Sequence, residues 1–99
     1  MSKKYIFNDL SYDLISNYKE GFVEEEVFSK LTDYFNSFDY VVGDWAYGKL
    51  RLKGFYNRNN KNCKKYNNIE RLDNYIKKQC AYECKYFVLK KINEEISKK

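Results

Sequence analysis

The sequence predicts an α+β fold in which two helices cover an antiparallel sheet of four or five strands, in the order β(β)-α-β-β-α-β. Three observations lead to this prediction. Apolar and polar residues alternate over residues 49–53, which is typical of a strand with one solvated face. Apolar residues recur every three or four positions over residues 22–38, and again over residues 69–80, which is typical of amphipathic helices. We expect both helices to cover the same face of the sheet.

The first half of the chain begins with a predicted hairpin. Two apolar segments, residues 5–7 and 12–15, flank the turn-forming pair Asn-Asp at residues 8–9, so we expect a short hairpin or one bent strand. Gly21 ends this region. The three glutamates at 24–26 fall in the first turn of the expected helix, where negative charge favours the helix dipole. We interpret them as a helix start and not as a metal site.

The second half continues with strands on both sides of the second helix. Residues 39–45 and 49–55 are predicted to form a hairpin, because only a short connection separates them. Residues 57–68 are rich in asparagine and lysine and show no apolar periodicity, which indicates a loop. Residues 85–89 form the expected final strand.

Size and composition limit the class of protein. Ninety-nine residues suffice for one core, and 43% hydrophobic residues argue against disorder. We therefore expect one domain over residues 1–92 and a charged tail over residues 93–99. Charge interrupts every apolar segment, and the N-terminus lacks the apolar region of a signal peptide, so we expect a cytoplasmic protein. In that compartment the three cysteines would be reduced thiols: Cys63, Cys80 and Cys84.

The charges separate along the chain. Residues 1–47 contain four lysines and nine acidic residues, a net charge of −5, while residues 48–99 contain fifteen basic and five acidic residues, a net charge of +10. Such a split suggests that one surface attracts a polyanion while another repels it. A codon bias towards lysine is the competing explanation for the lysine content, although it does not explain the separation.

Several segments together resemble a known family. They are Gly21-Phe22, the block DYVVGDWAYGKLRLKGFY at 39–56, and the pattern Leu72, Tyr75, Cys80, Cys84 that leads into YFVLKKI at 86–92. On these residues the chain resembles the YutD-like family of small bacterial proteins. The resemblance implies an α+β domain in the bacterial cytoplasm, and it carries over no catalytic residue.

Basic residues of the second half are the candidate contacts for a nucleic acid or another anion. If the strand is regular, Lys49, Arg51, Lys53 and Phe55 share one face, where cations contact phosphates and an exposed ring stacks on a base. The following loop supplies further cations: Arg58, Lys61, Lys64 and Lys65. The alternative interpretation is a solvated sheet edge that lysines protect against aggregation.

A Gly-Asp-Trp corner is the second candidate region, and its residues are Gly43, Asp44, Trp45, Tyr47 and Gly48. Asp44 lacks the commonest proton-transfer partner, because the chain contains no histidine. We therefore interpret the corner as structural. Cys80 and Cys84 share a helix face, but a closed zinc site needs four ligands. No catalytic residue, metal or cofactor is expected.

Three functions remain open. The leading hypothesis is a non-enzymatic interaction domain whose basic second half binds RNA or a ribonucleoprotein. The second is a regulatory protein–protein module that uses the tyrosines and the tryptophan near the corner. The third is a small enzyme acting on an anionic ligand, with Asp44 or Asp39 as base and Arg51 as anion clamp; no nucleophile–base pair supports it.

Overall fold

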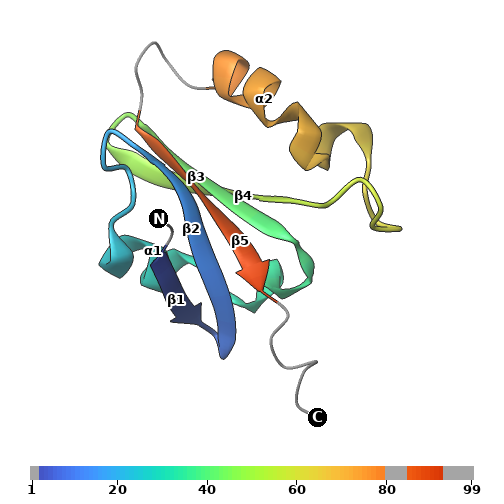
Figure 1. Ribbon diagram of the computed structural model, residues 1–99. Helices are drawn as coiled ribbons and strands as arrows, with labels where there is room; N and C mark the ends of the chain where they lie inside the picture. The colour runs from blue at the N-terminus through green and yellow to red at the C-terminus, as the bar shows by residue number, and fades with distance from the viewer. Residues whose placement is uncertain (1–2, 80–84, 93–99) are drawn as a thin grey trace.

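A computed structural model describes residues 3–79 and 85–92. Five strands form one antiparallel sheet in the order β1-β2-β5-β3-β4 (Figure 1). The strands are β1 (Lys3–Phe7), β2 (Leu10–Tyr18), β3 (Tyr40–Ala46), β4 (Lys49–Phe55) and β5 (Tyr86–Ile92). The helices are α1 (Glu24–Lys30), η1 (Asp33–Ser37), η2 (Lys65–Asn67), η3 (Ile69–Arg71) and α2 (Leu72–Gln79), of which the three η elements are 3-10 helices. The predicted α+β class and element order are confirmed.

Two tight turns make the hairpins. Asn8 and Asp9 both have positive φ, 56° and 64°, and they join β1 to β2. Tyr47 and Gly48, at φ 55° and 75°, join β3 to β4 in the same way. Paired positive φ values define the type I′ turn, whose twist matches that of the flanking strands. Both predicted hairpins are therefore present.

The sheet is buried on both faces, because alternate residues of its central strands point to opposite sides. Val41 belongs to an apolar cluster with Val27 and Leu31, from α1 and the residue that follows it. Val42 belongs to a second cluster, in which Phe55 and Val88 are buried and residues of η3 and α2 pack against them. We call these sides the α1 face and the α2 face; Figure 1 shows α1 and α2 on opposite sides of the sheet.

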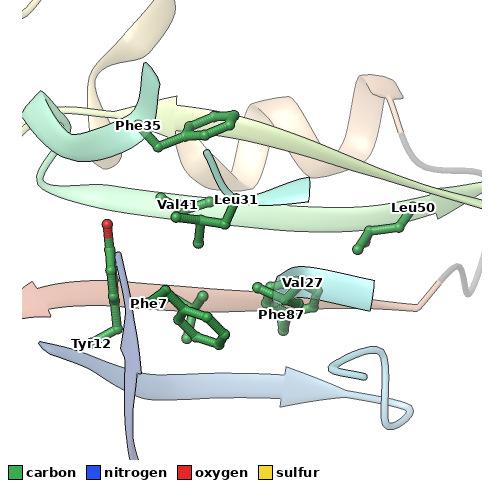
Figure 2. Packing of buried hydrophobic residues seen from close by; sticks show 9 residues of the cluster. Phe7, Tyr12, Val27, Leu31, Phe35, Val41, Leu50 and Phe87 are labelled. Atoms are coloured by element: carbon green, nitrogen blue, oxygen red, sulfur yellow. The ribbon is translucent and has the colours of Figure 1, made fainter. Parts of the chain in front are cut away.

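The α1 face holds the larger core. Figure 2 shows the side chains of α1 and η1, among them Val27 and Phe35, close to residues of the sheet such as Phe87. Phe87 is fully buried, and its ring occupies the space above Gly43 of the neighbouring strand. A Cβ atom at Gly43 would lie 2.1 Å from Cζ of that ring. Glycine at position 43 is therefore a packing requirement of this core.

Two predictions about the helices are wrong. The helix expected over residues 22–38 is interrupted, because Leu31 and Thr32 leave the helical conformation between α1 and η1. Leu31 and Phe35 are nevertheless buried in the same core. Apolar residues therefore keep a helix-like spacing in the sequence although the helix itself is broken between them. The two helices also cover opposite faces and not the same face, because Val41 and Val42 are both buried.

The Gly-Asp-Trp segment is not a corner. All three residues lie within β3, and each pairs with a residue of β4 in regular register. The reversal of the chain comes later, at Tyr47 and Gly48. The expectation of a corner at residues 43–45 is therefore wrong.

The loop over residues 57–68 returns to the strand from which it leaves. The Tyr56 N–H donates to the Asn67 carbonyl (2.7 Å), and the Ile69 N–H donates to the Tyr56 carbonyl (2.9 Å). These bonds form a parallel bridge between Tyr56 and Asn68 just beyond β4. The loop is thereby fixed at the outer edge of the sheet.

Some predictions fall outside residues 3–79 and 85–92. The expected charged tail at 93–99 is one of them, and so are the predicted cysteine pair Cys80 and Cys84. No helix in the part of the chain that the structure describes is long and apolar enough to cross a membrane.

Candidate interaction surfaces

Asp44 and Arg51 form an ion pair across the β3–β4 hairpin. They are directly paired in the register, and Arg51 donates from Nε to Oδ1 at 3.0 Å and from Nη2 to Oδ2 at 3.1 Å. The Asp44 side chain is 1% exposed, whereas that of Arg51 is 44% exposed. Hydrogen bonding to Asp44 raises the pKa of the Arg51 guanidinium above its ordinary value. The pair thus anchors a buried carboxylate to a cation that still reaches solvent.

Helix α2 closes over this pair through Tyr75. Burial raises the pKa of the Tyr75 hydroxyl, and the charge of Asp44 together with hydrogen bonding to it raises the pKa further. The carboxylate therefore joins β3 to β4, and its charge influences the Tyr75 hydroxyl of α2. A bidentate contact of this kind is stronger and more directional than an ordinary hydrogen bond.

Trp45 and Tyr47 have different surroundings. The indole Nε1 of Trp45 donates to the carbonyl of Gly21 at 2.7 Å, and Lys85 Nζ lies 4.8 Å from the ring centroid. Gly21 is itself in close contact with the Tyr86 backbone, which leaves no room for a Cβ. Tyr47 is fully exposed at the turn. Of the predicted corner, Tyr47 is thus the aromatic residue most open to a partner.

The basic residues of β4 lie on one face of the sheet, as the alternation predicted, but the ring of Phe55 is not exposed there. Lys49, Arg51 and Lys53 all lie on the α2 face. Phe55 shares that face but is 1% exposed, because its ring packs edge-on against Tyr75 with centroids 5.5 Å apart. The expectation that Phe55 offers a ring to a nucleic-acid base is therefore wrong.

Lys53 is surrounded by rings. Its Nζ lies 5.2 Å from the centroid of Phe55, 5.8 Å from that of Tyr66 and 5.9 Å from that of Tyr75. Cation–π attraction of this type fixes the ammonium beside the rings. Tyr66 is 71% exposed, so it is the ring of this group that reaches solvent.

Residues that sequence analysis did not select complete a cationic surface beside Tyr66. A hollow of about 240 Å³ opens between the loop and α2 and is lined by Lys65, Arg71 and Lys78 together with Tyr66 and Tyr75. The predicted loop cations Lys61 and Lys64 are also exposed. Arg71 and Lys78 could have been found from the sequence, because they are seven positions apart and so share a side of a helix. We call Lys65, Tyr66, Arg71 and Lys78 the α2 cationic surface.

Arg58 and the glutamates of α1 lie away from the α2 cationic surface. Arg58 contributes to a loose ion pair, with its Nε 3.7 Å from Oε2 of Glu70, and both side chains are exposed. Glu24, Glu25 and Glu26 form the first turn of α1, on the opposite side of the sheet from α2. The glutamates of α1 and the α2 cationic surface thus lie on different faces.

A second hollow, of about 400 Å³, lies beside β4. Leu52, Lys53 and Gly54 of the strand line it, with Tyr34 and Phe38 on the side of the α1 face. Across the opening lie residues of the loop, including Lys64 and Tyr66. The ring of Phe38 packs directly on Gly54, where a Cβ would be 2.2 Å from Cγ.

The comparisons with known proteins agree with this fold. The profile of the family described as "Putative antitoxin YutD-like" matches residues 6–90. This chain belongs to the YutD-like family. The predicted resemblance is confirmed over most of the chain. The matched range contains the residues that line both hollows and those that form the ion pair.

The YutD protein of Bacillus subtilis is similar to this chain both in sequence and in structure. "Putative antitoxin YutD" of strain 168 is 42% identical over 89 residues, which cover 90% of this chain and 98% of the relative. The solution NMR structure of B. subtilis yutD has a TM-score of 0.77 and 41% identity, over 92% of this chain and 83% of that one. The fold described here is therefore the YutD fold.

The enzyme hypothesis needed Asp39 or Asp44 to share a site with Arg51 in this YutD-like chain. Asp44 is paired with Arg51, but it is buried in the sheet. Asp39 precedes β3 by one residue, about 17 Å along the strand from Asp44, and accepts hydrogen bonds from the Asn57 N–H (2.8 Å) and from Asn60 Nδ2 (3.1 Å). The two carboxylates therefore do not form one site.

Proposed function

We propose that the protein is a non-enzymatic interaction domain that binds RNA through the α2 cationic surface. The observation that carries the proposal is the hollow in which Lys65, Arg71 and Lys78 surround the exposed ring of Tyr66. Cations spaced around a stacking ring suit a flexible strand, since phosphates meet the cations while a base meets the ring. The glutamates of α1 lie on the opposite face, so they do not oppose this approach.

Filter binding of a single-stranded oligouridylate tests the proposal. Between about 50 mM and about 200 mM salt, affinity should fall steeply if phosphate contacts drive binding. The double variant Lys65→Ala/Lys78→Ala should bind more weakly and reduce the slope of log K against log salt by about 1.4, at about 0.7 for each lost contact on a single strand. Tyr66→Ala should weaken binding by about 1–3 kcal/mol without changing the slope.

A charge-matched variant separates a defined surface from net charge. Lys3 and Lys30 are exposed in the first half of the chain, and Lys3→Ala/Lys30→Ala removes the same charge. This variant should keep the affinity of the parent protein to within about twofold, because more distant charges are screened in salt. Equal losses in both double variants, or no binding near physiological salt, would remove the RNA proposal.

A protein partner is the second candidate function, and one finding favours it. The family and its B. subtilis member are both described as "Putative antitoxin", and an antitoxin counteracts a toxin. Affinity purification with and without nuclease distinguishes the two functions. Partners that persist after nuclease favour a protein partner, and partners that disappear favour RNA.

A further inference from the structure

The β4 edge of the sheet has unpaired backbone groups, and the hydrogen-bond pattern shows which residues carry them. The Trp45 N–H donates to the Lys85 carbonyl (3.2 Å), so odd-numbered residues of β3 turn their backbone groups towards β5. Even-numbered residues of β3 then face β4, where Val42 pairs with Lys53. The backbone N–H and C=O groups of odd-numbered β4 residues therefore bond to β3, and those of even-numbered β4 residues point away from the sheet.

The chain itself confirms this direction at one position. Tyr56, the next even-numbered residue after β4, uses its outward N–H and carbonyl to bond Asn67 and Ile69. Within residues 3–79 and 85–92, no backbone partner takes the outward groups of Leu52 and Gly54. These two residues line the hollow of about 400 Å³ beside the strand. The edge is thus open where there is room for another chain.

The two sides of this edge differ in chemistry. On the α2 face the strand presents Lys49, Arg51 and Lys53, and Lys64 lies across the hollow. On the α1 face it presents Leu50 and Leu52, and the hollow is lined there by Tyr34 and Phe38. A strand added to the edge would project alternate side chains to these two sides. Its best match therefore alternates acidic with apolar residues.

A second copy of this chain fits the edge poorly. If two β4 strands paired antiparallel to each other, both would bring Lys49, Arg51 and Lys53 to the same side of the joined sheet. Like charges on neighbouring strands destabilise the pairing. Charge complementarity thus selects an acidic occupant.

We infer that β4 is a docking edge for an extended segment of a partner protein in which acidic and apolar residues alternate. The segment adds a sixth strand at Leu50–Gly54, its backbone bonding Leu52 and its apolar residues entering the hollow beside Tyr34 and Phe38. This inference does not depend on RNA binding, because its tests leave Lys65 and Lys78 unchanged.

A fluorescent peptide, acetyl-Glu-Val-Glu-Phe-Glu-Val-Glu-amide, is the probe for this edge. Fluorescence anisotropy should show binding at least about tenfold tighter than to acetyl-Glu-Glu-Glu-Glu-Val-Phe-Val-amide, because only alternation separates the charged and apolar sides. Amide hydrogen exchange should slow at Leu52 when the alternating peptide binds, since this N–H gains a partner. Equal binding of both peptides, or unchanged exchange at Leu52, overturns the inference.

Two variants test the edge further. Leu52→Pro removes one outward N–H, which an edge strand tolerates, and it should weaken peptide binding by about tenfold. Lys49→Glu/Lys64→Glu leaves the backbone intact, so it provides the test if Leu52→Pro does not fold. It should bind the acidic peptide more weakly and the analogue with lysine in place of glutamate more tightly than the parent protein does.

The other occupants give distinct results. If Leu52 exchange slows with protein concentration alone while the protein dimerises, the occupant is a second copy and the inference fails. If oligouridylate slows Leu52 exchange and the alternating peptide does not, the edge binds nucleic acid and the inference also fails. Peptide-dependent protection of Leu52 supports the inference when it is joined by the expected effect of each variant that folds.

Discussion

The two faces of the sheet are built from different interactions. The α1 face buries one large cluster of apolar side chains, with α1 and η1 packed on the strands. The α2 face has a smaller cluster, beside which the buried Asp44 is paired with Arg51 and linked to Tyr75. One side of the sheet therefore contributes mainly hydrophobic stability. The other side orients charged residues at a cost in apolar contact.

The ion pair of the α2 face provides the largest expected effect. Arg51→Ala leaves Asp44 buried without its main partner, so we expect a loss of about 2–4 kcal/mol in the free energy of unfolding. Asp44→Asn leaves Arg51, which is 44% exposed and can be hydrated, so the loss should be about 1–2 kcal/mol. Urea denaturation with a fixed m-value measures both losses.

The double variant provides the control for this prediction. If the pair acts as a unit, Arg51→Ala/Asp44→Asn should lose less stability than the two single variants together. Equal losses of stability in the two single variants would contradict the expectation that the buried Asp44 costs more to leave unpaired than the partly exposed Arg51.

Two adjacent valines compare the faces directly. Val41 is 0% exposed on the α1 face and Val42 is 1% exposed on the α2 face, so burial and residue type are matched. We expect Val41→Ala to cost about 2–3 kcal/mol and Val42→Ala about 1–2 kcal/mol, because the larger core closes less readily around a cavity. Thermal and urea unfolding check the order, and a greater loss at Val42 would reverse the comparison.

Two tyrosines give the smallest effects, and the effects should have opposite signs. The hydroxyl of Tyr12 is buried in the α1 core, and no group among residues 3–79 and 85–92 bonds it. Tyr12→Phe should therefore be neutral or stabilise the fold by up to about 1 kcal/mol. Tyr75→Phe removes a hydroxyl whose pKa Asp44 influences, and it should cost about 1 kcal/mol. Destabilisation by both substitutions to a similar extent would contradict this difference.

The same tyrosines make the protein sensitive to alkali. Burial raises the pKa of Tyr12, and burial followed by the influence of Asp44 raises that of Tyr75. Because each folded pKa is raised, titration of these phenols leaves the free energy of unfolding unchanged below the unfolded pKa of about 10 and lowers it as the pH rises towards the higher folded pKa. Unfolding curves measured above about pH 10 should show a smaller decrease with pH in either phenylalanine variant.

The sequence predicted the strands better than it predicted which face of the sheet each helix packs against. Alternation at residues 49–53 identified β4, and the Asn8-Asp9 pair identified the first hairpin. The side of the sheet that each helix covers was predicted wrongly, because periodicity gives the apolar side of an element but not the surface against which that side packs. Only the burial of both Val41 and Val42 shows that β3 is covered twice.

The candidate site was predicted only in part, because local patterns do not show which distant segments pack together. Lys49, Arg51 and Lys53 lie on one face as expected. Phe55 is covered because α2, far along the chain, places Tyr75 over it, which no local pattern indicates. Tyr66 is a lone aromatic residue in a polar loop, so its position beside Lys53 follows only from the return of the loop to Tyr56.

The parallel bridge at Tyr56 also affects how this protein resists aggregation. An open strand edge is a template on which other molecules can stack, and a long uninterrupted edge stacks most readily. Here the returning loop covers the end of the strand, and lysines border the rest. The uncovered part of the edge is therefore short and positively charged, and like charges disfavour pairing of two copies of the protein along it.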